Sequence, residues 1–140
     1  MNINAEDVEK QRAVAERLEA FWNCEVLSHG ALDDLDFTLS RDGKIVGHAE
    51  LKCRGHNIET YDTVFLALHK WLCLVLASVA DGNPSYIVYR FDNGDLYWLD
   101  VCDVPTGSGK LTMDGARRTR SGRPNIEPMF SIPVELLHKL

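Results

Sequence analysis

Residues 33–52 alternate apolar and charged side chains, a pattern that predicts two β-strands joined by a tight turn. Asp42 and Gly43 mark the turn, because this dipeptide is typical of short hairpin connections. Acidic residues gather at the other, open end of the hairpin. We therefore interpret this hairpin as the element that carries the active site.

The register of the hairpin follows from the two faces of its strands. A two-residue turn would pair Arg41 with Lys44 and mix apolar and charged residues on each face. A three-residue loop, with Gly43 in the left-handed conformation of a bulge, pairs Ser40 with Lys44 and separates the two classes. We predict the second register, since a one-residue slip would turn the apolar set away from the core. The polar face then carries Asp34, Asp36, Thr38, His48, Glu50 and Lys52.

In this register Asp34 lies directly across from Glu50, Asp36 is one diagonal step away, and Lys52 follows on the same face. Carboxylates this close do not all ionise cheaply unless a cation lies between them. Hard oxygen ligands of this kind suit Mg²⁺. The alternative is a solvated polar face, which a sheet commonly turns to water.

The rest of the chain predicts an alternation of helices and strands. Helical spacing and a capping residue predict a first helix, and a long apolar run predicts a second. In chain order we expect a helix over 5–22, a strand over 24–28, the hairpin, a helix from 59 or 61 to 80, and strands over 85–91 and 96–101, the last two joined by a turn.

The composition changes after residue 104. Residues 105–124 are rich in Gly, Ser, Thr and basic residues and show no apolar period, so we expect a mobile loop or arm. Its basic side chains make it the candidate polyanion-binding segment, and a merely solvated loop is the alternative. Residues 128–132 are expected to add an edge strand and 134–140 a short closing helix that can also serve a dimer contact. The basic residues are Lys110, Arg117, Arg118, Arg120 and Arg123.

Asp36, followed by Glu50-Leu51-Lys52 on the neighbouring strand, resembles the Asp…(Asp/Glu)-x-Lys signature of the PD-(D/E)XK nuclease superfamily. The proline that often precedes the first Asp is replaced by Leu35. The predicted order of elements matches the αβββαβ core of that fold over about residues 5–91. The resemblance implies an α/β fold with a mixed sheet flanked by helices, with an extra C-terminal hairpin and tail. The length of the chain predicts a single domain over 1–140.

The resemblance also implies metal-dependent hydrolysis of phosphodiester bonds. Asp36 and Glu50 would hold Mg²⁺, for which Mn²⁺ can substitute, with the carbonyl of Leu51 as a third ligand, and Lys52 would assist the attacking water. Asp34 is a candidate for a further ligand. Family members often supply one more carboxylate from the first helix, where Glu9 is preferred to Glu16.

Two further basic residues flank this site and are candidates for contact with nucleic acid. Arg54 follows the second strand in a polar loop, where a plain loop role is the alternative. Lys70 interrupts an otherwise apolar helix, so its charge must reach solvent, a partner or a ligand. His56 and Tyr61 are nearby candidates for the same surface.

Composition bounds the class of protein. The chain has 140 residues, 45% hydrophobic and 26% charged, as expected of one globular domain. Its net charge of −6 weighs against nucleic acid without deciding the matter, because a local basic patch and a metal can offset it. Four widely spaced cysteines predict buried free thiols. We expect a cytoplasmic protein, since the N-terminal residues lack the blocks of a signal peptide and the apolar helix is too short to span a membrane.

The combined expectation is a small metal-dependent endonuclease acting on DNA, resembling phage-type nucleases and structure-selective resolvases, which commonly act as dimers. Two other classes stay open. The fold can serve as a catalytically silent nucleic-acid-binding or interaction module, although the intact Asp, Glu and Lys set weighs against this. It can also be a subunit that is active only within a larger assembly.

Overall fold

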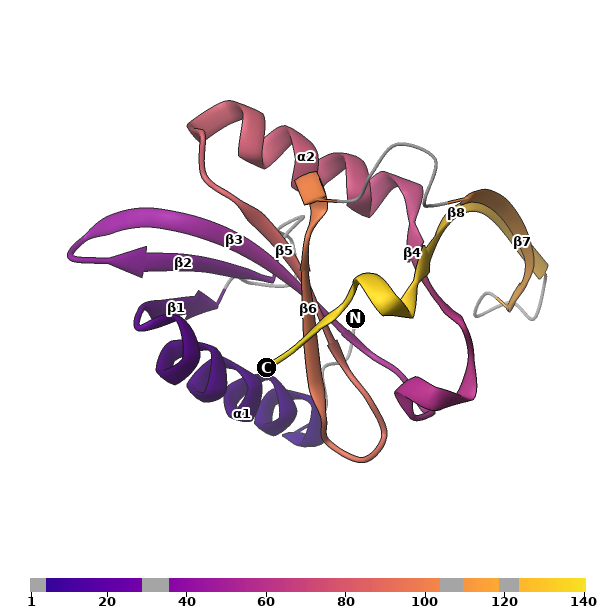
Figure 1. The fold of residues 1–140 in the computed structure, drawn as a ribbon, viewed down its shortest axis with the longest axis horizontal. Coiled ribbons are helices and arrows are strands. Elements are labelled where there is room, and N and C mark those ends of the chain that lie inside the picture. The colour runs from indigo at the N-terminus through magenta and orange to yellow at the C-terminus, as the bar shows by residue number, and fades with distance from the viewer. Residues whose placement is uncertain (1–4, 29–35, 104–109, 119–123) are drawn as a thin grey trace.

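A mixed sheet of six strands forms the centre of the part of the chain that the structure describes (Figure 1). The structure is a computed structural model, and it describes residues 5–28, 36–103, 110–118 and 124–140. Strands β3 and β5 are parallel, and every other neighbouring pair in this sheet is antiparallel. In spatial order the strands are β1 (Glu25–Ser28), β2 (Phe37–Arg41), β3 (Lys44–Cys53), β5 (Ser85–Arg90), β6 (Leu96–Asp100) and β9 (His138–Lys139).

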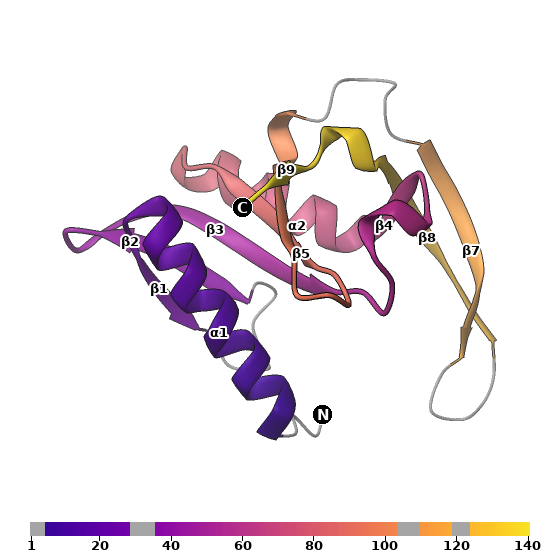
Figure 2. The same cartoon turned by 60° about the horizontal axis from the view of Figure 1, so that its bottom comes forward.

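Two helices cover opposite faces of this sheet, as Figures 1 and 2 show. Helix α1 (Ala5–Trp22) has the predicted bounds and packs Val14 and Leu18 into a core that includes Val88 of β5. Helix α2 (Leu68–Asp81) packs Leu74 into a second core that includes Ile87, the neighbour of Val88. Because successive side chains of a strand point to opposite faces, β5 supplies both cores. The continuous apolar run of β5 is the sequence signal of a strand buried on both sides.

A second, three-stranded antiparallel sheet lies beside the first, in the order β4 (Thr63–Ala67), β8 (Pro124–Pro133) and β7 (Lys110–Arg118). Figure 2 shows β7 and β8 as a long hairpin that projects from the body of the protein. In the described part of the chain, three short 3-10 helices connect other elements, namely Ile58–Thr60, Val101–Asp103 and Val134–Leu136.

The predicted start of the second helix was wrong. Residues 63–67 form strand β4, and the helix begins directly after it at Leu68. Val64 and Leu66 are buried whereas Phe65 between them is exposed, which is the alternation of a strand. The run from Val64 to Leu76 is apolar almost throughout, so neither the strand nor the helical period stands out in the sequence. Among the described residues no helix has the length and apolar character needed to cross a membrane.

The predicted mobile arm was wrong for residues 110–118, which form strand β7. The remaining positions of the predicted arm up to residue 123, among them Arg120 and Arg123, lie outside the described residues. The expected edge strand was also wrong in its place, because β8 lies between β4 and β7 and pairs with both. Residues 129–131 of β8 are paired on both sides, whereas 124–128, which include Pro128, pair with β7 alone and 132–133 with β4 alone. Strand partners, not strand propensity, thus define this ten-residue strand.

The predicted closing helix was wrong as well. Residues 134–136 form one 3-10 turn, and His138 and Lys139 pair with β6 at the edge of the central sheet. The residues after the turn are instead extended along β6, where the backbone N–H of Leu140 also donates to the carbonyl of Leu96 at 2.9 Å. The C-terminal strand thus covers an edge of the sheet that would otherwise expose unpaired backbone groups.

The four cysteines are free thiols, as predicted, but the expectation that they are buried was wrong. Cys53 and Cys102 are exposed, and Cys24 and Cys73 are partly exposed. Cys24 follows α1, Cys53 ends β3 and Cys102 lies in the 3-10 turn after β6, whereas Cys73 lies within α2. Local hydrophobicity does not reveal which of these positions reaches solvent.

Candidate active site

The hairpin of β2 and β3 closes with a two-residue turn, so the predicted three-residue loop was wrong. Arg41 pairs with Lys44, and both Asp42 and Gly43 have positive φ, 53° and 76°. This is the primed turn whose twist matches that of the strands. The irregularity sits instead between Leu39 and Ser40, where a bulge shifts the register.

Beyond the bulge Phe37 pairs with Ala49 and Thr38 with His48, a register two residues away from the predicted one. A shift of two residues preserves the faces, and Thr38 and His48 lie on one face as expected. The partner of Glu50 changes, however. Asp36 precedes Phe37 and is brought opposite Glu50, the place predicted for Asp34. Asp34 itself lies outside the described residues.

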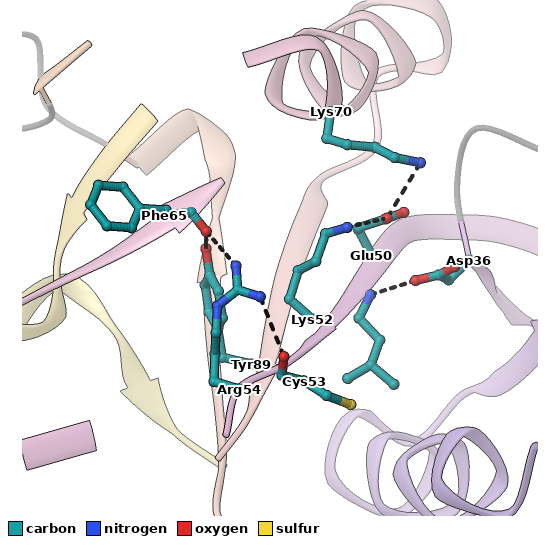
Figure 3. A network of polar contacts seen from close by, with 9 residues as sticks. Asp36, Glu50, Lys52, Cys53, Arg54, Phe65, Lys70 and Tyr89 are labelled. Atoms are coloured by element: carbon teal, nitrogen blue, oxygen red, sulfur yellow. Dashed lines mark hydrogen bonds and ion pairs between the residues drawn. The ribbon is translucent and has the colours of Figure 1, made fainter. Parts of the chain in front are cut away.

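Asp36 is fixed where β2 and β3 separate. The pairing of the two strands ends at Phe37 and Ala49, and the backbone N–H of Leu51 donates to Asp36 Oδ2 at 2.8 Å (Figure 3). In a strand the N–H and C=O of one residue point toward the same neighbour. The carbonyl of Leu51 therefore faces the side of β3 on which Asp36 lies.

Glu50 is the buried centre of the site. The residue is only 2% exposed, and its Oε1 lies 3.4 Å from Lys52 Nζ and 3.4 Å from Lys70 Nζ. Its Oε2 is buried and has no hydrogen-bond partner among the described residues. A buried, unpaired carboxylate oxygen is costly, so this atom is the observation in the site that most clearly calls for a ligand.

Burial raises the pKa of Glu50 above its ordinary value, and the nearby charge of Asp36 raises it further. The ammonium groups of Lys52 and Lys70 lower this pKa but do not outweigh the two other effects. Without a further cation the proton is thus held more tightly than in an exposed glutamate. A divalent cation at the two carboxylates would oppose both causes of the shift.

The two lysines come from different elements and converge on one oxygen. Lys52 follows Glu50 on the same face of β3, and Lys70 lies in the first turn of α2 (Figure 3). Their side chains are 26% and 24% exposed, so both charges are near solvent while Glu50 is not. Lys70, expected to reach solvent or a phosphate, is oriented by an ion pair with Glu50. Two carboxylates and two ammonium groups balance in charge here.

Arg54, two residues beyond Lys52, is held against the second sheet. Its Nη2 donates to the carbonyl of Phe65 at 2.7 Å, and its guanidinium carbon lies 5.4 Å from the ring centroid of Tyr89 (Figure 3). Arg54 thus links the end of β3 to β4. Its side chain makes specific contacts, unlike that of a loop residue that only faces solvent. His56 and Tyr61 lie together next to it, with ring centroids 4.8 Å apart.

The other residues that the sequence predicts for the site make no described contact with Asp36 or Glu50. Glu9 is exposed on α1, and no described contact joins it to the two carboxylates. Glu16 lines a surface groove that includes Phe37, the neighbour of Asp36. Lys110, Arg117 and Arg118 belong to β7 of the projecting hairpin. In the described part of the chain no group of three or more His, Cys, Asp or Glu side chains is placed to hold a metal.

His48, on the polar face of β3, is engaged elsewhere. Its Nε2 lies 2.6 Å from Asp81 Oδ2 at the end of α2. Burial acts to raise the pKa of Asp81, but hydrogen bonds with the backbone of Asn83 and with His48 outweigh it, and the pKa is lowered. This pair fastens the C-terminal end of α2 to β3, as Lys70 fastens its N-terminal end.

The chain is similar to known nucleases over nearly all of its length. A family model described as "Phage putative PDDEXK endonuclease" matches residues 3–140. The solved structure of Hjc, a Holliday junction resolvase from Archaeoglobus fulgidus, is similar with a TM-score of 0.55 and 15% identity, covering 91% of this chain and 86% of that one. A search of curated proteins finds no match. The structural likeness shows the fold alone, and the family match adds the class of activity.

The raised pKa of Glu50 predicts how stability depends on pH in the metal-free protein. The folded state holds this proton more tightly than the unfolded chain, so Glu50 lowers the free energy of unfolding as pH rises from the ordinary Glu pKa of 4.5 through the raised value. Glu50→Gln removes this effect. In urea titrations with EDTA, Glu50→Gln should gain stability relative to wild type as pH rises above the ordinary Glu pKa of 4.5.

The exposed Glu59 provides the matched control, since Glu59→Gln should leave the pH dependence of wild type in place. If wild type instead gains stability over Glu50→Gln as pH rises, the carboxylate is stabilised in its charged form and the assignment of its environment is wrong.

Proposed function

Because the chain belongs to the phage PDDEXK endonuclease family, a nuclease family of the PD-(D/E)XK type, we propose that it hydrolyses DNA phosphodiester bonds with a divalent cation bound at Asp36 and Glu50. The observation that carries this proposal is the buried Oε2 of Glu50, which has no partner among the described residues. Asp36 lies across from it, with one carboxylate oxygen committed to Leu51 N–H. The donor set fits Mg²⁺, which is commonly held by one or two carboxylates, and Mn²⁺ can substitute.

Asp36, Glu50 and the carbonyl of Leu51 would hold the cation between β2 and β3. Such a cation, when bound, polarises a phosphoryl oxygen and makes a nearby water more acidic. The ion pairs with Lys52 and Lys70 hold the buried carboxylate of Glu50 in place for such a cation. Asp34 and a glutamate of α1, with Glu9 the predicted one, are candidates for completing the set from outside the described cluster.

Lys52 is suited to act on the attacking water and on the charge that develops at phosphorus. Its ammonium group is near solvent yet oriented by Glu50, so it can turn toward a bound phosphate at small cost. Lys70 stands on the other side of the same oxygen and would neutralise the second charge of the transition state. The site without cation is balanced in charge, so a divalent cation would make it positive where an anionic substrate binds.

Cleavage assays on DNA test this proposal directly. With Mg²⁺ or Mn²⁺, wild type should cut at least one of single-stranded, duplex, flap and four-way-junction DNA. Glu50→Gln and Lys52→Ala should reduce the rate by about 10²–10³-fold or more, and Lys70→Ala should also reduce it, because each removes charge stabilisation made at the reacting phosphate. EDTA should abolish cleavage.

The exposed Lys44, on the turn of the same hairpin, supplies a matched control, and Lys44→Ala should cut like wild type. Circular dichroism must show that every variant folds. A wild-type protein that binds DNA with Mg²⁺ but cuts none of the four substrates would contradict the enzyme proposal and favour a silent binding module.

The basic residues of the projecting hairpin are proposed to contact the DNA backbone outside the catalytic site. In the sequence, residues 110–123 concentrate positive charge in a chain of net charge −6, and Lys110, Arg117 and Arg118 of this stretch lie in β7. Replacing Arg117 and Arg118 with Ala should weaken binding and make it less dependent on salt. On duplex DNA, the slope of log K against log salt should fall by about 0.9 for each phosphate that the variant no longer neutralises. Lys139→Ala, at an exposed lysine of β9, should leave the slope unchanged.

A homodimer is proposed from the outer side of α2. Leu72, Leu76 and Val79 form an apolar stripe there that is 45%, 64% and 77% exposed, and such a patch commonly marks an interface. Two copies would bring two active sites to two DNA strands. Sedimentation should show wild type as a dimer and Leu76→Glu as a folded monomer, with Ile45→Glu, an exposed apolar residue of β3, still dimeric. A monomeric wild type would contradict the dimer.

A further inference from the structure

A groove of about 570 Å³ opens beside the catalytic strand, beyond Lys52. Its size is within the range of sites that hold small ligands. Three of its lining side chains carry rings and one carries a permanent positive charge, a composition unlike that of an ordinary polar surface. The residues that carry the argument are Arg54, His56, Tyr61, Phe65 and Met129.

Two aromatic rings of this groove are exposed. Tyr61 is 60% exposed and Phe65 42% exposed, whereas Met129, which also lines the groove, is buried. Phe65 faces outward because its neighbours Val64 and Leu66 occupy the core side of β4. The ring of His56 stands perpendicular to that of Tyr61, with centroids 4.8 Å apart, and this contact orients the tyrosine. The groove thus presents two exposed rings, one of which, Tyr61, is oriented by His56.

Strand β3 and the side chain of Arg54 connect the active site to the groove. Arg54 directly follows the last residue of β3 and lies two positions beyond Lys52, a separation of about 6.6 Å along an extended chain. The Arg54 side chain then reaches the Phe65 carbonyl and covers the ring of Tyr89, the residue that pairs with Lys52 (Figure 3). A nucleotide next to the one at Lys52 would therefore meet Arg54 first and the rings of the groove next.

We propose that this groove binds an unstacked nucleobase adjacent to the scissile phosphate, and that the enzyme therefore acts on DNA with unpaired nucleotides in preference to continuous duplex. The inference rests on the proposed nuclease function and names its substrate class. Tyr61 and Phe65 supply the stacking surface, and Arg54 supplies a positive charge toward the adjoining phosphate.

The chemistry of the groove favours an unpaired nucleobase over other ligands. Bases inside a duplex already stack on one another, so only an unpaired or flipped base can stack on an aromatic side chain. The guanidinium of Arg54 donates hydrogen bonds to the carbonyls of Phe65 and Cys53. These bonds hold its positive charge in place near Lys52. The acidic neighbours Glu59 and Asp62 do not line the groove. An anionic ligand with a flat apolar part fits this combination.

Binding assays with matched DNA probes test the proposal. One probe is a duplex with a short unpaired gap that carries 2-aminopurine, and the other is the fully paired duplex of the same sequence, both measured by anisotropy in EDTA. Tyr61→Leu and Phe65→Leu keep apolar volume but remove the ring. Each should weaken binding to the gapped probe about 5-fold or more, the lower range for loss of one base stack, and leave binding to the paired probe unchanged.

Tyr61→Phe, which keeps the ring, should bind both probes like wild type and should retain the change of 2-aminopurine fluorescence. Phe21, 51% exposed on α1, provides a control for loss of an exposed ring elsewhere, and Phe21→Leu should bind like wild type. Because Tyr61 and Phe65 are exposed, thermal unfolding of these variants should match that of wild type.

The outcomes also separate this inference from the proposed function. If Tyr61→Leu and Phe65→Leu bind the gapped probe like wild type, or lose affinity for both probes equally, the groove does not hold a base and the inference is wrong even where wild type cleaves DNA. If the two variants lose affinity only for the gapped probe, but wild type with Mg²⁺ cleaves neither probe and none of the four substrates of the cleavage assay, the base site stands and the nuclease proposal fails.

Discussion

A buried carboxylate held between two ammonium groups is the constraint on which the rest of the site depends. Glu50 is almost fully buried and shares Oε1 between Lys52 and Lys70, which leaves Oε2 without a described partner. Taking a charge out of water is tolerated only where the partners are positioned accurately. The protein meets this demand with one lysine from the same strand and one from a helix that crosses the sheet. The fold must therefore hold α2 over β3 with little freedom.

The second sheet provides part of that restraint. Strand β4 runs directly into α2, so Lys70 lies only three residues beyond the last residue of β4. Strand β4 is in turn paired along its whole length with β8. The C-terminal hairpin thus has a structural task near the active site in addition to its proposed contact with DNA. At the far end of α2, the pair of His48 and Asp81 fastens the helix to the same strand that carries Glu50.

The position of Asp36 depends on how the hairpin ends. Strand pairing stops at Phe37, and the next free backbone donor on β3, Leu51 N–H, is taken by the Asp36 carboxylate. The sequence pattern placed Asp36, Glu50 and Lys52 together on one face but paired Glu50 with Asp34. The error came from the turn, since an Asp-Gly turn with two positive φ angles and a bulge after Leu39 displaced the register by two residues. A displacement by two residues keeps these side chains on the predicted face. The polar face was therefore predicted correctly although the paired residues were not.

The sequence by itself determined the alternation of the hairpin, the first helix, the strands on either side of the turn at residues 92–95, and the acid and lysine residues of the nuclease signature. These are local properties, because periodicity and turn chemistry act between residues a few positions apart. Tertiary structure alone decided that residues 63–67 are a strand, that 110–118 pair with β8, and that Lys70 and Arg54 turn toward Glu50 and Phe65. Each of these depends on a partner distant in the chain, and an apolar or basic run carries no mark of which strand or carboxylate will lie beside it once the sheet has formed.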